Sequence, residues 1–423
     1  MSAPAEAQHL RALLIAVALL TAARFVAAAL LPLSFDEAYY WLWSKHLALS
    51  YYDHPATVAY AIRAGTTIFG DTPFGVRVVA LLCSIGASWA VWRAGALLTE
   101  SETGGALSCL FFNLTLMATV ETMTATPDAP LMMTSAFFIW ALAKLRQSGD
   151  GRWWLAVGAA GGAALLSKYT ALFLGAGALA WLLFTREGRR WLASPWLWLG
   201  GVLAVALFAP VLVWNAQHDW ISLRFQLGKA GTRHFAPHHL IDFLAGQIAL
   251  ASPFIFVLFT LGLARGRKAR SPLLLALAAP SILFFVEHSL QAPVQGNWPS
   301  FLYPALAIAA AETAEWTAGA HWTERLAAFS KRWAFPTAAL MLALSYGQAL
   351  TGFLPVRDPT ARLLANGIGP VAQRLEAWRG QTHAGAILTT SYAETGWLAF
   401  YLPSHPPVIE ADEDYRWLAA PKA

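Results

Sequence analysis

The chain has 423 residues, of which 57% are hydrophobic and 13% are charged, and its formal net charge is +5. Soluble domains carry about 25% charged residues, so this composition excludes a disordered chain and argues against a water-soluble one. The positive charge and the 20 Trp are typical of a polytopic membrane protein with basic loops and aromatic belts, and they require no nucleic-acid partner.

Apolar runs long enough to form membrane helices recur along the first 354 residues. A helix needs about 20 apolar residues to cross the hydrocarbon core, and somewhat fewer when neighbouring helices bury it. The first run, Leu10–Leu31, is long for a signal peptide and is expected to be a retained anchor. With it we predict an all-α polytopic membrane protein of about eleven transmembrane helices. The other runs are Phe74–Leu98, Gly104–Val120, Ala129–Leu145, Trp153–Leu166, Thr170–Phe184, Trp196–Trp214, Leu240–Ala264, Pro272–Glu287, Ser300–Ala314 and Ala334–Leu354.

The basic residues between these runs predict the orientation. If the N-terminus is cytoplasmic, every even-numbered span ends inside, and the basic clusters all fall on that side. These clusters are Lys144, Arg146 and Arg152; Arg186, Arg189 and Arg190; Arg265, Arg267, Lys268 and Arg270; and Arg325, Lys331 and Arg332. We therefore predict a multi-pass membrane protein with a cytoplasmic N-terminus.

The first outer segment, Leu33–Asp71, carries a dense group of polar residues. Its stretches Glu37–Leu47 and Thr57–Ile68 are amphipathic, so we expect two helices beside the membrane. Asp36 and Glu37 stand directly after the first span. Acids in the first turn stabilise a helix by about 0.5–1 kcal/mol, which is one ordinary explanation for both residues. The alternative explanation is a reaction at the membrane surface.

The tail after the last span is expected to fold outside the membrane. It contains a helix-like stretch, Ala361–Trp378, and a strand-like run, Ala386–Thr390. We predict two units: a transmembrane domain with its outer loops at 1–354, and a small α/β domain outside the membrane at 355–423.

Further polar residues occupy the other outer loops, although charges near a bilayer are costly without a partner or a task. Asp128 lies between two prolines, where it could cap a helix, and Lys168 could extend to the interface as lysines commonly do. Trp298 could anchor an aromatic belt. The candidate catalytic residues are Asp36, Glu37 and Asp128. The candidate substrate-binding residues are Lys168, Tyr169, Asp53, His54, Tyr52, Arg233, Asn297 and Trp298.

Taken together, these residues suit one reaction, the transfer of a sugar from a lipid phosphate to a hydroxyl or an amine. An acid would accept the proton of the acceptor. A cation would stabilise the charge that develops on the departing phosphate. Aromatic and apolar surface would hold the sugar and the lipid.

The motifs resemble those of a known family. The string Asp36-Glu37-Ala38-Tyr39-Tyr40-Trp41-Leu42-Trp43-Ser44, followed by Tyr51-Tyr52-Asp53-His54-Pro55, resembles the first periplasmic loop of bacterial glycosyltransferase family 39. That family is similar to the protein O-mannosyltransferases and the lipid A aminoarabinose transferases of the GT-C class. Further matching segments follow in the expected order: Thr126-Pro127-Asp128-Ala129-Pro130-Leu131, Ser167-Lys168-Tyr169-Thr170, Asn297-Trp298-Pro299, Asp358-Pro359-Thr360-Ala361-Arg362-Leu363 and Phe400-Tyr401-Leu402-Pro403.

The resemblance implies an inverting transfer from a polyprenyl-phosphate sugar at the periplasmic face of the bacterial inner membrane. It also implies that 1–354 is the catalytic domain, with periplasmic loops, and that 355–423 is a small periplasmic domain. The acceptor would be lipid A, another glycolipid, a polysaccharide or a protein. In this interpretation Asp36 is the general base or orients the acceptor. Asp128 helps to bind the acceptor or the sugar, and Lys168 contacts the donor phosphate.

One element departs from the pattern of the aminoarabinose transferases. Where they carry Lys-Pro-Pro, this chain has Asp53-His54-Pro55-Ala56. We therefore expect a different transferase, with phosphate contacts partly from Arg224, Lys229 or Arg233.

A divalent cation is a further expectation of the same resemblance. Mg²⁺ or Mn²⁺ could bind the oxygens of Asp36, Glu37 and Asp128. No His/Cys spacing predicts zinc.

Two other functions stay open from the sequence. A flippase or transporter of lipid-linked sugars would also be polytopic and would also bind phosphate. Transporters, however, place charges and broken helices near the midplane, whereas the charges here gather on one face. A GT-C enzyme with a larger donor, such as an oligosaccharide ligase, is the other alternative.

Overall fold

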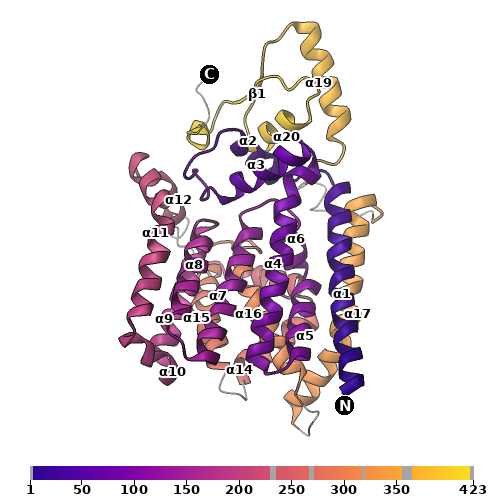
Figure 1. Ribbon diagram of the computed structural model, residues 1–423. Helices are drawn as coiled ribbons and strands as arrows, with labels where there is room; N and C mark the ends of the chain where they lie inside the picture. The colour runs from indigo at the N-terminus through magenta and orange to yellow at the C-terminus, as the bar shows by residue number, and fades with distance from the viewer. Residues whose placement is uncertain are drawn as a thin grey trace.

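The computed structural model describes residues 3–228, 235–265, 271–316, 319, 321–354 and 364–419 as a helical bundle with a small cap at one end (Figure 1). The bundle helices are α1 (Ala3–Leu30), α4 (Pro73–Thr99), α5 (Glu102–Leu114), α6 (Leu116–Glu121), α7 (Asp128–Ser148), α8 (Trp153–Leu165), α9 (Leu172–Phe184), α11 (Pro195–Gln217), α13 (His238–Ala251), α14 (Pro253–Arg265), α15 (Ser271–Ser289), α16 (Tyr303–Ala314) and α17 (Trp322–Thr351). The shorter connecting helices are α10 (Arg186–Arg189) and α12 (Ile221–Gly228), with 3-10 turns η1 (Tyr169–Ala171), η2 (Arg190–Ala193) and η3 (Ser300–Leu302).

Fewer helices meet the length and composition of a full span than the sequence predicts. In the described residues four helices do so: Glu6–Leu30, Pro73–Thr99, Pro195–Gln217 and Pro272–Ser289. The number is up to six if each of two bent helix pairs is one span. The remaining predicted runs do form helices, but several, such as α5 with 13 residues and α16 with 12, are shorter than the roughly 20 residues that a lone span needs.

The run predicted as a single span, Leu240–Ala264, forms two helices in the structure, a bent pair that makes at most one span. α13 and α14 meet at 104° at Ser252, whose φ is +70°. Pro253 follows Ser252, and proline disfavours the helical conformation in the residue before it while suiting the first turn of a new helix. The apolar composition shows how long this hydrophobic run is, but it does not show that the chain bends sharply within it.

The N-terminus and α10 lie at the end of the bundle opposite the cap (Figure 1). Arg146 at the end of α7 donates from Nε to Oε1 of Glu187 in α10, at 2.7 Å. This bond joins the segments that hold two of the basic clusters. These two clusters therefore lie on the same side of the bundle, as the sequence predicts.

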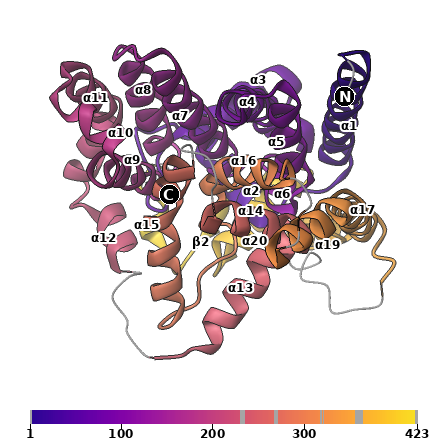
Figure 2. The ribbon, with the colours of Figure 1, turned by 90° about the horizontal axis from the view of Figure 1, so that it is seen from below.

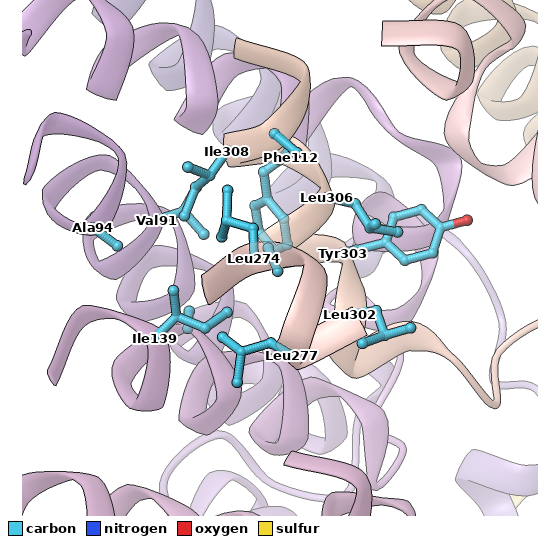
Figure 3. Packing of buried hydrophobic residues seen from close by; sticks show 14 of the residues in the cluster. Val91, Ala94, Phe112, Ile139, Leu274, Leu277, Leu302, Tyr303, Leu306 and Ile308 are labelled. Carbon is cyan, nitrogen blue, oxygen red and sulfur yellow. The ribbon is translucent and has the colours of Figure 1, made fainter. Parts of the chain in front are cut away.

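The core of the bundle forms around α16. Every residue of α16 is buried, and the helix contacts α4, α5, α7, α14, α15 and α17. Figure 2 views the bundle from the N-terminal end and shows α16 in its middle. In Figure 3, Val91, Phe112, Ile139, Leu277 and Ile308 from five different helices point toward one another. This packing holds the ends of α6, α7 and η3 in fixed positions below the cap.

The two amphipathic helices predicted in the first outer segment are present, as α2 (Phe35–Lys45) and α3 (Thr57–Phe69). They lie across the end of the bundle (Figure 1). A capping box starts α2: the Ser34 side chain accepts from the Glu37 N–H, and the Glu37 carboxylate accepts from the Ser34 N–H at 2.9 Å. Such reciprocal caps satisfy backbone donors that the helix itself leaves unpaired.

The described tail is a small α/β cap, as predicted. It contains α19 (Ile368–Thr382), β1 (Ile387–Thr389), α20 (Tyr392–Tyr401), β2 (Val408–Glu410) and the 3-10 turn η4 (Asp414–Trp417). The two strands pair in parallel, with Ile387 opposite Val408. Of the predicted helix Ala361–Trp378, residues 361–363 lie outside the described part, and residues 364–367 are not helical. The helix α19 begins at Ile368.

The cap is attached firmly to the first outer segment. α20 packs on α2, and Phe400 belongs to the same buried cluster as Tyr39 and Trp41. Trp397 donates from its indole nitrogen to the Leu33 carbonyl at 3.1 Å. The tail therefore shares a core with the loop that precedes it by more than 300 residues.

Candidate functional site

The structure brings three of the predicted outer loops together at Asp128. This residue begins α7 and is 1% exposed. Its Oδ2 accepts from Lys168 Nζ at 2.7 Å and from Asn297 Nδ2 at 3.1 Å. Its Oδ1 accepts from the Ser300 hydroxyl at 2.5 Å. Asp128 thus connects α7 with the turn after α8 and with the segment before α16.

Lys168 is held by the local backbone between α8 and η1. The residue is extended, with φ −156° and ψ 142°, and it is 5% exposed. Its N–H donates to the Ala164 carbonyl at 3.0 Å, which closes the end of α8. Thr57 of α3 donates to the Leu166 carbonyl at 2.7 Å and fixes this turn beneath the first outer segment. Lys168 is therefore held directly beside the carboxylate of Asp128, and two buried charges need such close alignment to offset the cost of their burial.

Asp36 lies in the first turn of α2, outside the candidate spans, and is partly buried. Burial raises the pKa of its carboxyl to about 7, and the negative charge of Asp53 adds to the rise while Lys168 opposes it. The carboxyl of Asp36 therefore changes its charge near neutral pH. This is the range in which a general base works best.

Glu121, at the end of α6, is a further acid that the sequence analysis did not select. Burial and the nearby charge of Asp128 raise the pKa of Glu121 to about 8. Thr126 donates to its Oε2 at 3.4 Å. The only sequence signal was a carboxylate that ends an apolar run. We call Asp36, Glu121, Asp128 and Lys168 the acidic cluster.

Glu37, predicted to be catalytic, has a different environment. The residue is fully buried, and Arg77 of α4 donates to both of its oxygens at 2.6 Å. The Ala125 N–H donates to Oε1 at 2.9 Å, in addition to the cap with Ser34. Burial would raise the pKa of Glu37, but Arg77 and the backbone donors lower it below its ordinary value. Each oxygen already has two donors, so Glu37 joins α2 to α4 and to the segment before α7 and has no oxygen left for a substrate.

The predicted metal set of Asp36, Glu37 and Asp128 does not assemble. The described residues hold no group of three His, Cys, Asp or Glu side chains arranged for a metal ion. The physical reason is that the carboxylates already have other partners. Arg77 pairs with Glu37, and Asp128 accepts hydrogen bonds from Lys168, Asn297 and Ser300.

Asp53 pairs with a residue of the cap that the sequence analysis missed. Arg416 Nη1 lies 2.8 and 2.7 Å from the two carboxylate oxygens of Asp53, and Tyr39 donates to Oδ2 at 2.9 Å. Tyr52 packs on Phe225 and Tyr415. No local pattern could have connected Arg416 to a loop so far away in the sequence.

The other predicted residues occupy varied positions around the acidic cluster. The ring of His54 contacts the ring of Tyr40, and the hydroxyl of Tyr169 bonds to Ser222 at 2.8 Å. Trp298 donates to Gln295 and packs near Phe285 and His288. Arg224 is exposed on α12. Arg233 and Lys229 lie outside the described residues.

An apolar cavity of about 170 Å³ adjoins the acidic cluster. It lies between α3, α4 and α7, and its lining includes Val58, Ile62, Ala80, Cys83 and Met133. Ala125 and Thr126 also line it. Since Thr126 bonds to Glu121, the cavity and the acids share a wall. The arrangement therefore offers an apolar space directly beside titratable groups.

The fold defines the class of the protein, a multi-pass membrane protein of the GT-C type. It is similar to ArnT from Cupriavidus metallidurans, solved with undecaprenyl phosphate, with a TM-score of 0.65 and 17% identity over 96% of this chain and 87% of that one. It is also similar to the archaeal oligosaccharyltransferase AglB from Archaeoglobus fulgidus, with a TM-score of 0.57 and 12% identity over 97% and 65% of the two chains.

The sequence comparison points to a related family. Residues 53–214 match the family described as dolichyl-phosphate-mannose-protein mannosyltransferase, so this segment is similar to that family. The match agrees with the resemblance to the glycosyltransferases that the sequence motifs predict. The lipid A galacturonosyltransferase RgtD from Rhizobium johnstonii is 27% identical over 285 residues, which are 65% of this chain. The aligned region spans 59% of RgtD, less than two thirds of its length.

Proposed function

We propose that this protein is a membrane glycosyltransferase that transfers one sugar from a polyprenyl-phosphate donor to an acceptor at the periplasmic face of the bacterial inner membrane. The observation that carries the proposal is the acidic cluster beside an apolar cavity at one end of the bundle. A lipid-linked sugar phosphate needs both features: titratable acids and a lysine for its polar end, and an apolar space for its chain.

In this proposal Asp36 is the general base. It accepts the proton of an acceptor hydroxyl while that oxygen attacks the anomeric carbon. The bond from the anomeric carbon to the phosphate oxygen breaks on the opposite side, so the configuration inverts. The polyprenyl phosphate leaves with the bonding electrons, and the ammonium of Lys168 stabilises its charge. Asp128 pairs with Lys168 and holds it in position, and Asn297 and Ser300 in turn donate to Asp128.

Lipid A is the acceptor that we propose first. ArnT was solved with undecaprenyl phosphate, and RgtD is named for transfer of galacturonic acid to lipid A. These two relatives support an undecaprenyl-phosphate donor and a lipid A acceptor over another glycolipid, a polysaccharide or a protein.

We also propose a topology for this function. The N-terminus and the basic clusters face the cytoplasm, and the cap and the acidic cluster face the periplasm. The short helices cross part of the membrane within the bundle, where their neighbours bury them, and complete the eleven crossing segments. Residues 1–354 form the catalytic unit, and 355–423 form its cap.

Mass spectrometry of envelope glycolipids tests the proposal. Cells that contain the gene should carry lipid A heavier by one sugar unit, and cells without it should lack this species. Reconstitution in proteoliposomes distinguishes this transferase from the main alternative, a flippase. If the protein scrambles lipid-linked sugars between leaflets and forms no product, it is a flippase and the proposal is wrong.

A further inference from the structure

Arg416, close to the end of the described chain, makes a close ion pair with the first outer segment. Its Nη1 lies within 2.8 Å of both oxygens of Asp53, and both side chains are 13% exposed. Nε of the same guanidinium lies 2.9 Å from Glu413 Oε2. Ion pairs that are this well shielded from water and this well aligned are stronger than exposed ones.

Aromatic rings enclose the pair. The guanidinium of Arg416 lies 4.6 Å from the ring centre of Tyr392 and 5.5 Å from that of Tyr52. Tyr39, which donates to Asp53, packs against Tyr392 with ring centres 4.8 Å apart. A cation over aromatic faces is stabilised further when water is displaced. The cap thus contributes Tyr392 from α20 and Arg416 from η4 to the surroundings of Asp53.

This pair lies over the first turn of α2. Tyr39 follows Asp36 by three residues, so the two side chains occupy the same face of the helix. Tyr392, which contacts Tyr39, also packs on Phe35 with ring centres 6.0 Å apart. Asp53 is therefore held beside the carboxylate that the proposed function uses as its base.

We propose that Arg416 is a positioning residue of the transfer site, which fixes Asp53 beside Asp36 and neutralises its charge there. The inference rests on the proposed function for its consequence in catalysis. It assigns to the cap a task in that reaction: without Arg416, the uncompensated charge of Asp53 would keep Asp36 protonated and unable to accept a proton at neutral pH.

Several charged or titratable groups face Asp36, and Arg416 acts through one of them. Asp53 exerts the largest influence of any single charge on the pKa of Asp36, and it raises that pKa. The groups are Glu37 and Tyr40 from α2, Asp53 from the first outer segment, Glu121 from α6, Asp128 from α7, Lys168 from the turn before η1, and Tyr392 from α20.

The titration midpoint of Asp36 should shift in opposite directions in two variants, and this distinguishes the proposed role of Arg416 from a purely structural one. Arg416→Met leaves the charge of Asp53 uncompensated, so the titration midpoint of Asp36 should move to higher pH, by about half a unit to one unit. Asp53→Asn removes the charge itself, so the midpoint should move to lower pH. The double variant should resemble Asp53→Asn. A contact that only holds the cap in place would be broken by either substitution, with the same effect.

Infrared difference spectroscopy of the protein in nanodiscs can follow the Asp36 carboxyl during a pH titration, with Asp36→Asn as the assignment control. The pH profile of kcat/KM should show the same opposite shifts. Arg416→Lys should restore part of the wild-type midpoint. Shifts in one direction for Arg416→Met and Asp53→Asn, or no shift in either, would overturn the inference. The infrared titration requires no turnover, so failure of the wild type to transfer sugar would count against the proposed function alone.

Discussion

The ammonium of Lys168 and the carboxylate of Asp128 lie 2.7 Å apart, and each is almost completely buried. These residues are separated by 40 positions, and the ends of α8 and α7 bring them together. Burying two charges costs free energy that their attraction offsets only in a well-aligned pair. The cost is understandable if a negatively charged group of a substrate joins the pair during function.

Lys168→Met should weaken donor binding far more than acceptor binding. A hydrogen bond to a charged group contributes about 1.5–3 kcal/mol, so the donor Kd should rise about 10- to 100-fold. Isothermal titration with a polyprenyl phosphate measures this directly. Lys45→Met is the matched control, since Lys45 forms an exposed pair with Asp71 at the same end of the molecule. Equal losses of donor and acceptor binding would make Lys168 a structural residue.

The raised pKa of Asp36 predicts a dependence of stability on pH. Because its pKa is about 7 in the folded protein and near 3.8 in the unfolded chain, the ionised carboxyl destabilises the fold. The free energy of unfolding should therefore fall as pH rises from about 4 to about 7. Asp36→Asn should remove this part of the fall, which amounts to a few kcal/mol. Thermal unfolding in detergent across this pH range tests it, and parallel curves for the variant and the wild type would contradict the prediction.

Glu37 should matter for folding and not for chemistry. Glu37→Gln leaves Arg77 buried without a counter-charge, a change that costs about 3–5 kcal/mol. Fluorescence-detected chromatography should show a loss of folded protein, and the fraction that remains folded should transfer sugar at a normal rate. A well-folded Glu37→Gln protein without activity would show that the acid takes part in the reaction.

The sequence predicts the features of this fold that depend on local patterns, but not those that depend on contacts between residues far apart in the chain. The amphipathic stretches became α2 and α3 because the period of apolar residues is a local property. Glu37 was assigned to chemistry because its partner Arg77 follows 40 positions later on another helix. Arg416 was missed for the same reason, at a separation of 363. Hydropathy also indicated that a run is apolar without showing that α13 and α14 bend at Ser252.

Replacing the Glu121 carboxyl by an amide should have little effect on activity at neutral pH. Its pKa of about 8 means that the carboxyl is mostly protonated at pH 7, and glutamine has a similar shape without the charge. Glu121→Gln should keep near-normal kcat/KM at pH 7 and differ from the wild type only above about pH 8. A pH profile of both proteins measures this. A large loss at pH 7 would mean that Glu121 works in its ionised form.

Filling the apolar cavity should impair long-chain donors selectively. Ala80→Leu would place additional methyl groups in the cavity of about 170 Å³ between α3, α4 and α7. The KM for an undecaprenyl donor should rise about tenfold, while a short-chain donor should be affected little. Cys83→Ala, which enlarges the same cavity, is the control and should leave both KM values nearly unchanged. Equal effects of Ala80→Leu on both donors would mean that the cavity does not hold the chain.

Sugar transfer by the purified protein is the most direct test of the central claim. The protein in nanodiscs is supplied with lipid A and an undecaprenyl-phosphate sugar, and the products are weighed by mass spectrometry. The wild type should form lipid A with one added sugar together with free undecaprenyl phosphate. Asp36→Asn should bind the donor and reduce the rate at least about 100-fold. Undiminished transfer by Asp36→Asn would contradict its role as the base, and the absence of any transfer by the wild type would contradict the account as a whole.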